Sequence, residues 1–121
     1  MKIFYALIAV LATPAFADGH RSSDLILDQA GMSTLLSGKI VTFFDGSKST
    51  YAADGTYGYT YTDDGPIWRG DYTLEDNSRV CVVFENGEQR CDMFVIDGER
   101  AILITRDGTR FPVRNLTVYQ Q

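Results

Sequence analysis

Short runs of β-branched and aromatic residues alternate with polar turn residues along most of the chain. Asp-Gly or Asn-Gly pairs recur at near-regular spacing, and a polar Glu-Asp-Asn-Ser stretch fills the one gap. These pairs favour tight hairpins because both residues tolerate positive φ. The runs between them are rich in Val, Ile, Thr, Tyr and Phe, as strands are. They are Lys39–Phe44, Ser47–Ala53, Thr56–Thr62, Ile67–Leu74, Arg79–Phe84, Glu88–Ile96, Glu99–Arg106 and Thr109–Tyr119.

This pattern predicts a mostly β domain over residues 39–119. The simplest topology is an antiparallel meander of about eight short strands, which forms a small barrel or a sandwich. We favour the barrel because closure removes exposed strand edges. The Asp-Gly repeats lack the Asp-x-Asp-x-Asp-Gly spacing of calcium loops, so turn chemistry explains them better.

Residues 18–38 form a separate N-terminal segment ahead of the strands. Leu25, Ile26, Met32 and Leu35 have loosely helical spacing, Ser22 or Ser23 is a candidate N-cap, and Gly38 follows as a stop signal. We expect one short or broken helix that covers an end or an edge of the sheet.

The first 17 residues, MKIFYALIAVLATPAFA, have the pattern of a cleaved signal peptide. A basic residue precedes an apolar run, and Ala15-Phe16-Ala17 supplies the small-x-small pattern accepted by signal peptidase before Asp18. The apolar run is shorter than the roughly 20 residues that span a bilayer. We therefore expect a periplasmic or secreted protein with no stable membrane insertion after cleavage.

Cys81 and Cys91 flank the turn Glu85–Gly87. A three-residue loop with left-handed Gly87 places the two cysteines directly opposite each other, at a non-hydrogen-bonded pair where Cα atoms are about 4.5 Å apart. A two-residue turn would send them to opposite faces, so the pairing depends on the loop type. With that register we expect a structural disulfide, which an oxidising compartment also favours.

An aromatic face is the candidate ligand-binding surface. Pairing around Asp64-Gly65 is predicted to place Tyr61 opposite Trp68, Tyr59 opposite Gly70, and Tyr57 opposite Tyr72, all on one face that points inward. A barrel of this size either fills its interior with side chains or holds one small ligand. A filled core, with Gly70 making room for the Tyr59 ring, is favoured, and a ligand-lined cavity stays open. The candidate ligand-facing residues are Tyr57, Tyr59, Tyr61, Trp68 and Tyr72.

The charge balance argues against a nucleic-acid partner. Eleven Lys and Arg residues face sixteen Asp and Glu residues, for a net charge of −5. Nucleic-acid affinity comes largely from basic residues that neutralise phosphates.

Metal and catalytic motifs are equally scarce. The one histidine, His20, is expected at a frayed mature N-terminus, and two cysteines alone do not complete a zinc site. We predict no metal and no cofactor. An enzyme is less favoured than a binding protein; the alternative is a cell-envelope hydrolase acting through carboxylates such as Asp71 or Asp92.

Several motifs together resemble small exported β-rich bacterial proteins of unknown function. They are LLSGKIVTFFDGSKSTYAADGTYGY, WRGDY, RVCVVFENGEQRCDMF and DGTRFPV, which cover most of residues 35–113. The resemblance implies a periplasmic setting and an intact Cys81–Cys91 pair, and it supplies no active site. From the whole sequence we expect a binding or interaction module that engages a small apolar molecule or an envelope protein.

Overall fold

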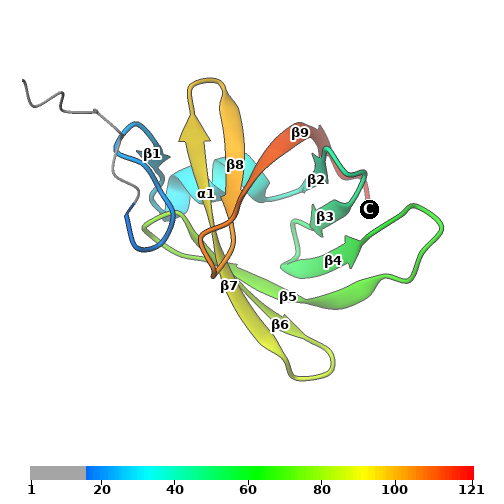
Figure 1. Ribbon diagram of the computed structural model, residues 1–121. Helices are drawn as coiled ribbons and strands as arrows, with labels where there is room; N and C mark the ends of the chain where they lie inside the picture. Colours follow the sequence, from blue (N-terminus) through cyan, green and yellow to red (C-terminus); the bar gives the residue numbers. More distant parts are fainter. Residues whose placement is uncertain (1–15) are drawn as a thin grey trace, which may run out of the picture.

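The computed structural model, which describes residues 16–121, is an antiparallel β-barrel (Figure 1). Every strand from β2 onward pairs with the next strand in the chain, and the last pairs with β2, so the barrel is closed. This confirms the mostly β prediction and decides between barrel and sandwich. The eight barrel strands are β2 (Lys39–Phe43), β3 (Lys48–Tyr51), β4 (Thr56–Thr60), β5 (Trp68–Leu74), β6 (Arg79–Phe84), β7 (Gln89–Asp97), β8 (Arg100–Ile104) and β9 (Arg110–Val118).

The predicted turns join these strands, and aspartate side chains hold several of them. In the β3–β4 turn, the Thr56 amide and hydroxyl both donate to the Asp54 carboxylate, at 3.0 and 2.7 Å. The β5–β6 turn contains no glycine. There Asn77 and Ser78 themselves adopt the left-handed conformation, each with φ of 60°, so polar residues complete the turn series at the expected place.

The helix is short, as predicted, but it begins later than Ser22 or Ser23. Helix α1 spans Gln29–Leu36, and the Asp28 side chain caps it by accepting from the Gly31 amide at 2.8 Å. The residues before it are extended because strand β1 (Leu25–Ile26) pairs with Ile96 and Val95 of β7. Pairing with the barrel therefore overrides the helical spacing of the first apolar residues in this segment.

The two ends of the barrel differ. Helix α1 packs against β2 and β5 at the end that carries the β3–β4 and β5–β6 turns, and its Met32 and Leu36 are completely buried in the core. We call this the helix end. The opposite end carries the β4–β5 loop and the β6–β7 turn, which extend away from the helix (Figure 1). We call it the open end.

A second, smaller core lies on the outer face of β7 and β8. Val95, Ile102 and Ile104 are buried there, with Met93 packed against them. The N-terminal segment contacts this cluster: a Cβ added to Gly19 would lie 2.9 Å from Ile104 and 2.7 Å from the Gly108 carbonyl oxygen. Only glycine fits this close approach, so the segment before α1 is part of the folded domain.

A buried ion pair fixes the same segment to the barrel. Arg110 Nη1 and Nη2 donate to the two oxygens of the Asp24 carboxylate at 2.6 and 2.9 Å, and the Asp24 side chain has no exposed surface. The Arg21 amide donates to the same carboxylate. His20 is accordingly docked and partly buried, so the expectation that it lies at a frayed terminus is wrong.

The predicted signal peptide falls almost entirely outside the described residues. Between Phe16 and Gln121, no helix has the length and apolar character needed to cross a membrane.

Candidate functional site

The cysteine hairpin forms as its loop type requires. The Phe84 amide donates to the Glu88 carbonyl, the Gly87 amide donates to the Phe84 carbonyl, and Gly87 has φ of 87°. Cys81 therefore stands opposite Cys91, with 4.1 Å between the Cα atoms, and the two form a disulfide. This disulfide is compatible with an oxidising compartment.

The register of the aromatic strands differs from the prediction by two residues. Tyr59 stands opposite Trp68, and Tyr57 stands opposite Gly70. The shift arises because residues 61–67 form a long loop with its own turn, closed by a hydrogen bond of 3.0 Å from the Gly65 amide to the Thr62 carbonyl. Since the shift is even, the predicted faces are kept although the predicted partners are wrong.

Gly70 has a different role from the one predicted. A Cβ at this position would lie 2.4 Å from the Val83 carbonyl oxygen of the neighbouring strand β6. Gly70 is therefore required for the close approach of two backbones, and it does not make room for the Tyr59 ring.

Two of the five candidate ligand-facing residues belong to the packed core. Tyr57 and Tyr72 are both buried, and their rings pack against Tyr51 at centroid distances of 5.2 Å. The Tyr72 hydroxyl donates to the Ala52 carbonyl at 2.6 Å, and the Tyr57 hydroxyl shares a hydrogen bond of 3.0 Å with Ser49. Burial raises the pKa of Tyr57 to about 12, so this phenol is neutral at physiological pH.

The other three candidates gather at the open end. We call Tyr59, Tyr61 and Trp68 the open-end aromatic group. The Tyr59 and Tyr61 rings meet edge to face at 4.9 Å, and Trp68 is the cross-strand neighbour of Tyr59. Tyr61 is 64% exposed and Trp68 is 49% exposed, whereas Tyr59 is partly buried against the core.

A groove of about 470 Å³ lies across β3–β6 next to this group. Tyr59 lines it together with the exposed apolar side chains of Ile67 and Val83. Charged residues of both signs surround them, including Arg69 and Asp71. Aliphatic and charged side chains therefore lie close together on the outer face of the wall, and of the open-end aromatic group only Tyr59 lines this groove.

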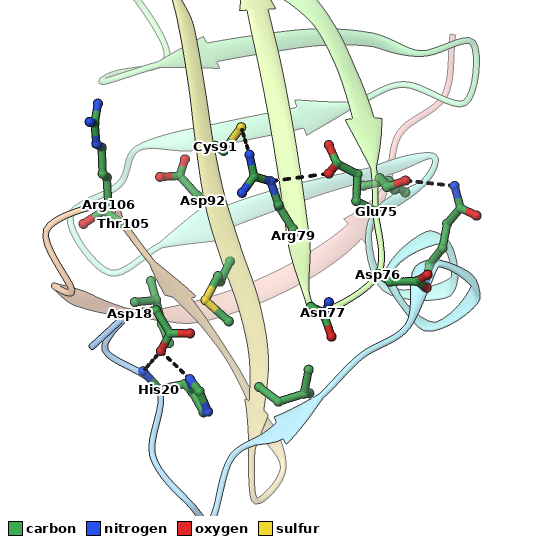
Figure 2. A pocket seen from close by; sticks show the side chains of 15 residues that line it. Asp18, His20, Glu75, Asp76, Asn77, Arg79, Cys91, Asp92, Thr105 and Arg106 are labelled. Carbon is green, nitrogen blue, oxygen red and sulfur yellow. Dashed lines mark hydrogen bonds and ion pairs between the residues drawn. The ribbon is translucent and has the colours of Figure 1, made fainter. Parts of the chain in front are cut away.

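A larger and more polar cleft, of about 930 Å³, lies between the N-terminal segment, the β5–β6 turn and β7 (Figure 2). Glu75 pairs with Arg79 at 3.4 Å, and the Arg79 guanidinium also donates to the sulfurs of Cys81 and Cys91 at 3.3 and 3.2 Å. On the other side of the cleft, the His20 amide donates to the Asp18 carboxylate at 3.0 Å, and the His20 ring Nδ1 contacts the same carboxylate.

The two carboxylates considered for hydrolysis lie on opposite faces of the barrel wall. Asp92 shares the inner face of β7 with the buried Phe94 and pairs with Arg90 at 2.7 Å. Burial alone would lower the pKa of Arg90, but the hydrogen bond to Asp92 and the negative charge of that carboxylate, with smaller contributions from Tyr57 and Tyr51, together raise it. Asp71 lies on the outer face, between the inward Gly70 and Tyr72. The two do not form the facing carboxylate pair that glycoside hydrolysis uses.

In the described part of the chain, no three His, Cys, Asp or Glu side chains gather in a way that could hold a metal ion. A metal site in this part of the chain would therefore need other ligands in addition to such side chains.

The comparisons with known proteins give no match: no family model, no curated protein and no solved structure is similar to this chain.

The sequence analysis missed the Asp24–Arg110 pair and the docking of residues 18–20. Asp24 and Arg110 are 86 positions apart, and neither belongs to a recognisable motif. The only hint was Gly19 followed by a histidine, which is too short a pattern to predict a contact with the β8–β9 turn.

Proposed function

We propose that this protein is an exported binding module that engages a protein of the cell envelope through the open-end aromatic group. The observation that carries this proposal is the exposure of Tyr61 and Trp68 beside Tyr59 at the end of the barrel that the helix does not cover. Aromatic side chains are enriched at protein interfaces, where they dominate the binding energy.

The packing of the interior favours an external partner over a small apolar ligand inside the barrel. Val41, Phe94, Met32 and Leu36 have no exposed surface and contact one core that includes both candidate tyrosines Tyr57 and Tyr72. A ligand would have to displace these side chains. A partner protein can instead bind the exposed Tyr61 and Trp68 without unpacking the core.

Export is supported by two independent features. The first 17 residues match a signal peptide that ends at Ala17, and the Cys81–Cys91 disulfide suits an oxidising compartment such as the periplasm. Binding is favoured over catalysis because Asp71 and Asp92 lie on opposite faces of the wall and Asp92 is already paired with Arg90.

Site-specific photo-crosslinking in the producing cell tests the proposal. A photoreactive phenylalanine analogue replaces Tyr61 in one variant. In the matched control it replaces Phe44, which is 57% exposed but packs under the Arg100 guanidinium, 5.0 Å from its ring centroid. We expect a discrete adduct to an envelope protein from position 61 and none from position 44. Failure of the folded Tyr61 variant to form an adduct, or the same adduct from both positions, contradicts the proposal.

A further inference from the structure

The tripeptide Asp18-Gly19-His20 lies at the edge of the polar cleft, against the barrel (Figure 2). Phe16 contacts two groups of this tripeptide. Its ring stacks on the His20 ring at 4.0 Å, and its carbonyl accepts from the Gly19 amide at 2.9 Å. The Phe16 amide also donates to the His20 carbonyl. Removal of residues 1–17 eliminates all three contacts.

Cleavage after Ala17 would also change the chemistry of this tripeptide. It creates an α-amino group on Asp18 and makes His20 the third residue of the mature chain. Four nitrogens then follow one another along the chain: the α-amine, the amide nitrogens of Gly19 and His20, and Nδ1 of the His20 ring. Nitrogen ligands in a square plane are the arrangement that Cu²⁺ prefers, and imidazole is a favoured ligand of this metal.

We propose that the mature N-terminus Asp18-Gly19-His20 is a Cu²⁺-binding site, an inference that rests on the exported form having been cleaved after Ala17. The α-amine binds as the neutral amine, the two amides release their protons to solvent, and the copper remains Cu²⁺ throughout. Because two of the four ligands are backbone amides, the site needs no cluster of His, Cys, Asp and Glu side chains.

The surroundings in the fold assist this chelation. The His20 ring already directs Nδ1 to the Asp18 carboxylate, so the imidazole lies beside the residue that carries the α-amine after cleavage. Arg110 Nη1 donates to the Gly19 carbonyl oxygen at 3.1 Å. Deprotonation of the His20 amide places negative charge on that oxygen, and a charged donor stabilises such an acceptor. Metal binding then replaces the bonds of His20 to the Asp18 carboxylate.

The experiment is a Cu²⁺ titration of the protein purified after export, whose N-terminus is first determined from its intact mass. We expect a chain that starts at Asp18 to bind one Cu²⁺ and to give the visible absorption of a square-planar four-nitrogen complex.

Two variants act as controls. His20→Ala removes the imidazole, and one serine added before Asp18 moves the α-amine out of the chelate. We expect each to lose that absorption and to weaken binding by more than the roughly 10–100-fold that loss of an outer-shell partner costs a metal site. The far-ultraviolet circular dichroism of each variant should match the wild type.

The failing outcomes separate the two proposals. An exported chain that starts at another residue overturns the copper site, and the crosslinking test at Tyr61 is unaffected. A chain that starts at Asp18 but binds Cu²⁺ equally well after His20→Ala also overturns the copper site, and in that case export stands.

Discussion

The helix end and the open end of this barrel both contain aromatic residues, but these residues are buried at the helix end and partly exposed at the open end. At the helix end, Tyr72 lies beneath α1 and contacts Tyr51, and its hydroxyl donates to a backbone carbonyl. Four residues earlier on the same strand and the same face, Trp68 is about half exposed. Position along the barrel axis therefore decides which aromatic residues stabilise the fold and which are available to a partner.

The interactions that stabilise the two ends also differ. Apolar burial dominates near α1, where Met32 and Leu36 are fully buried. Toward the open end, ion pairs also contribute, such as the Arg90–Asp92 pair inside the wall and the Lys48–Asp63 pair at 2.8 Å. We therefore expect core substitutions and changes of pH to affect different parts of the molecule.

The largest contrast should come from two truncations on β5. Tyr72→Ala removes a buried ring and leaves a cavity, which should lower the free energy of unfolding by about 3–5 kcal/mol. Trp68→Ala removes a half-exposed ring and should cost about 1 kcal/mol or less. Urea unfolding followed by circular dichroism measures both. Equal losses would contradict the division between the two ends.

Loss of the Asp24 carboxylate should have the next largest effect. Asp24→Asn leaves the Arg110 guanidinium with an uncharged and poorly matched partner, so we expect the free energy of unfolding at pH 7 to fall by about 2–3 kcal/mol. Asp63→Asn, which removes the exposed partner of Lys48, serves as the control and should cost less than about 0.5 kcal/mol. An effect of Asp24→Asn as small as that of Asp63→Asn would show that the N-terminal segment does not need this ion pair.

The same pair gives a pH dependence with a defined sign. The hydrogen bond from Arg110 lowers the pKa of Asp24 below its ordinary value. Its stabilisation is therefore present above the unfolded-state pKa of about 3.9 and is lost as the pH falls through the lower folded-state pKa. Below about pH 4, the free energy of unfolding of Asp24→Asn should decline less steeply with falling pH than that of the wild type. If the two free energies decline in parallel, Asp24 is not a source of the acid sensitivity.

Reduction of the disulfide should have a comparable or slightly smaller effect. Cys81 and Cys91 close a loop with a sequence separation of 10, and such a cross-link contributes about 2–3 kcal/mol through the unfolded chain. The Cys81→Ser/Cys91→Ser double variant should unfold at a correspondingly lower urea concentration. The wild type in a reducing agent should coincide with it, and the reducing agent should leave the double variant unchanged. A wild type that keeps its full stability after confirmed reduction would contradict this account.

Tyr57→Phe should produce the smallest change. It removes the hydroxyl that bonds to Ser49 while the ring remains packed, so we expect a loss of about 1 kcal/mol. It should also remove one high-pKa phenol from the ultraviolet titration of tyrosine, since burial raises the pKa of Tyr57 to about 12. Tyr61→Phe is the matched control at the open end, where we expect no measurable loss of stability. An unchanged titration for Tyr57→Phe would contradict its burial.

Much of the fold could be predicted because its signals are local. Asp-Gly and Asn-Gly turns delimit the strands, and the Glu85–Gly87 loop alone fixes the cysteine pair. Alternation also predicted that Tyr57 and Tyr72 share a face. Alternation could not predict how deeply each side chain is buried. The exposure of Trp68 depends on where the β4–β5 loop begins, and that loop has a turn of its own between Thr62 and Gly65.

The features that escaped prediction are those set by distant parts of the chain. Gly70 is needed because the β6 backbone approaches it, and residues 18–24 dock because Arg110 and Gly108 lie opposite them. The first apolar residues before α1 have a helical spacing, yet pairing with β7 makes Leu25 and Ile26 extended. Sequence patterns reveal faces and turns, whereas close approaches require the assembled barrel.

The most direct test of the account is native mass spectrometry of the protein purified from its own cell envelope, as wild type and with the open-end aromatic group altered. We predict that the wild type carries a partner protein. The Tyr61→Ala/Trp68→Ala variant should lose the partner, and Phe44→Ala should retain it. A wild type that is free of any partner, or a complex that survives the double substitution, would contradict a binding role for the open end.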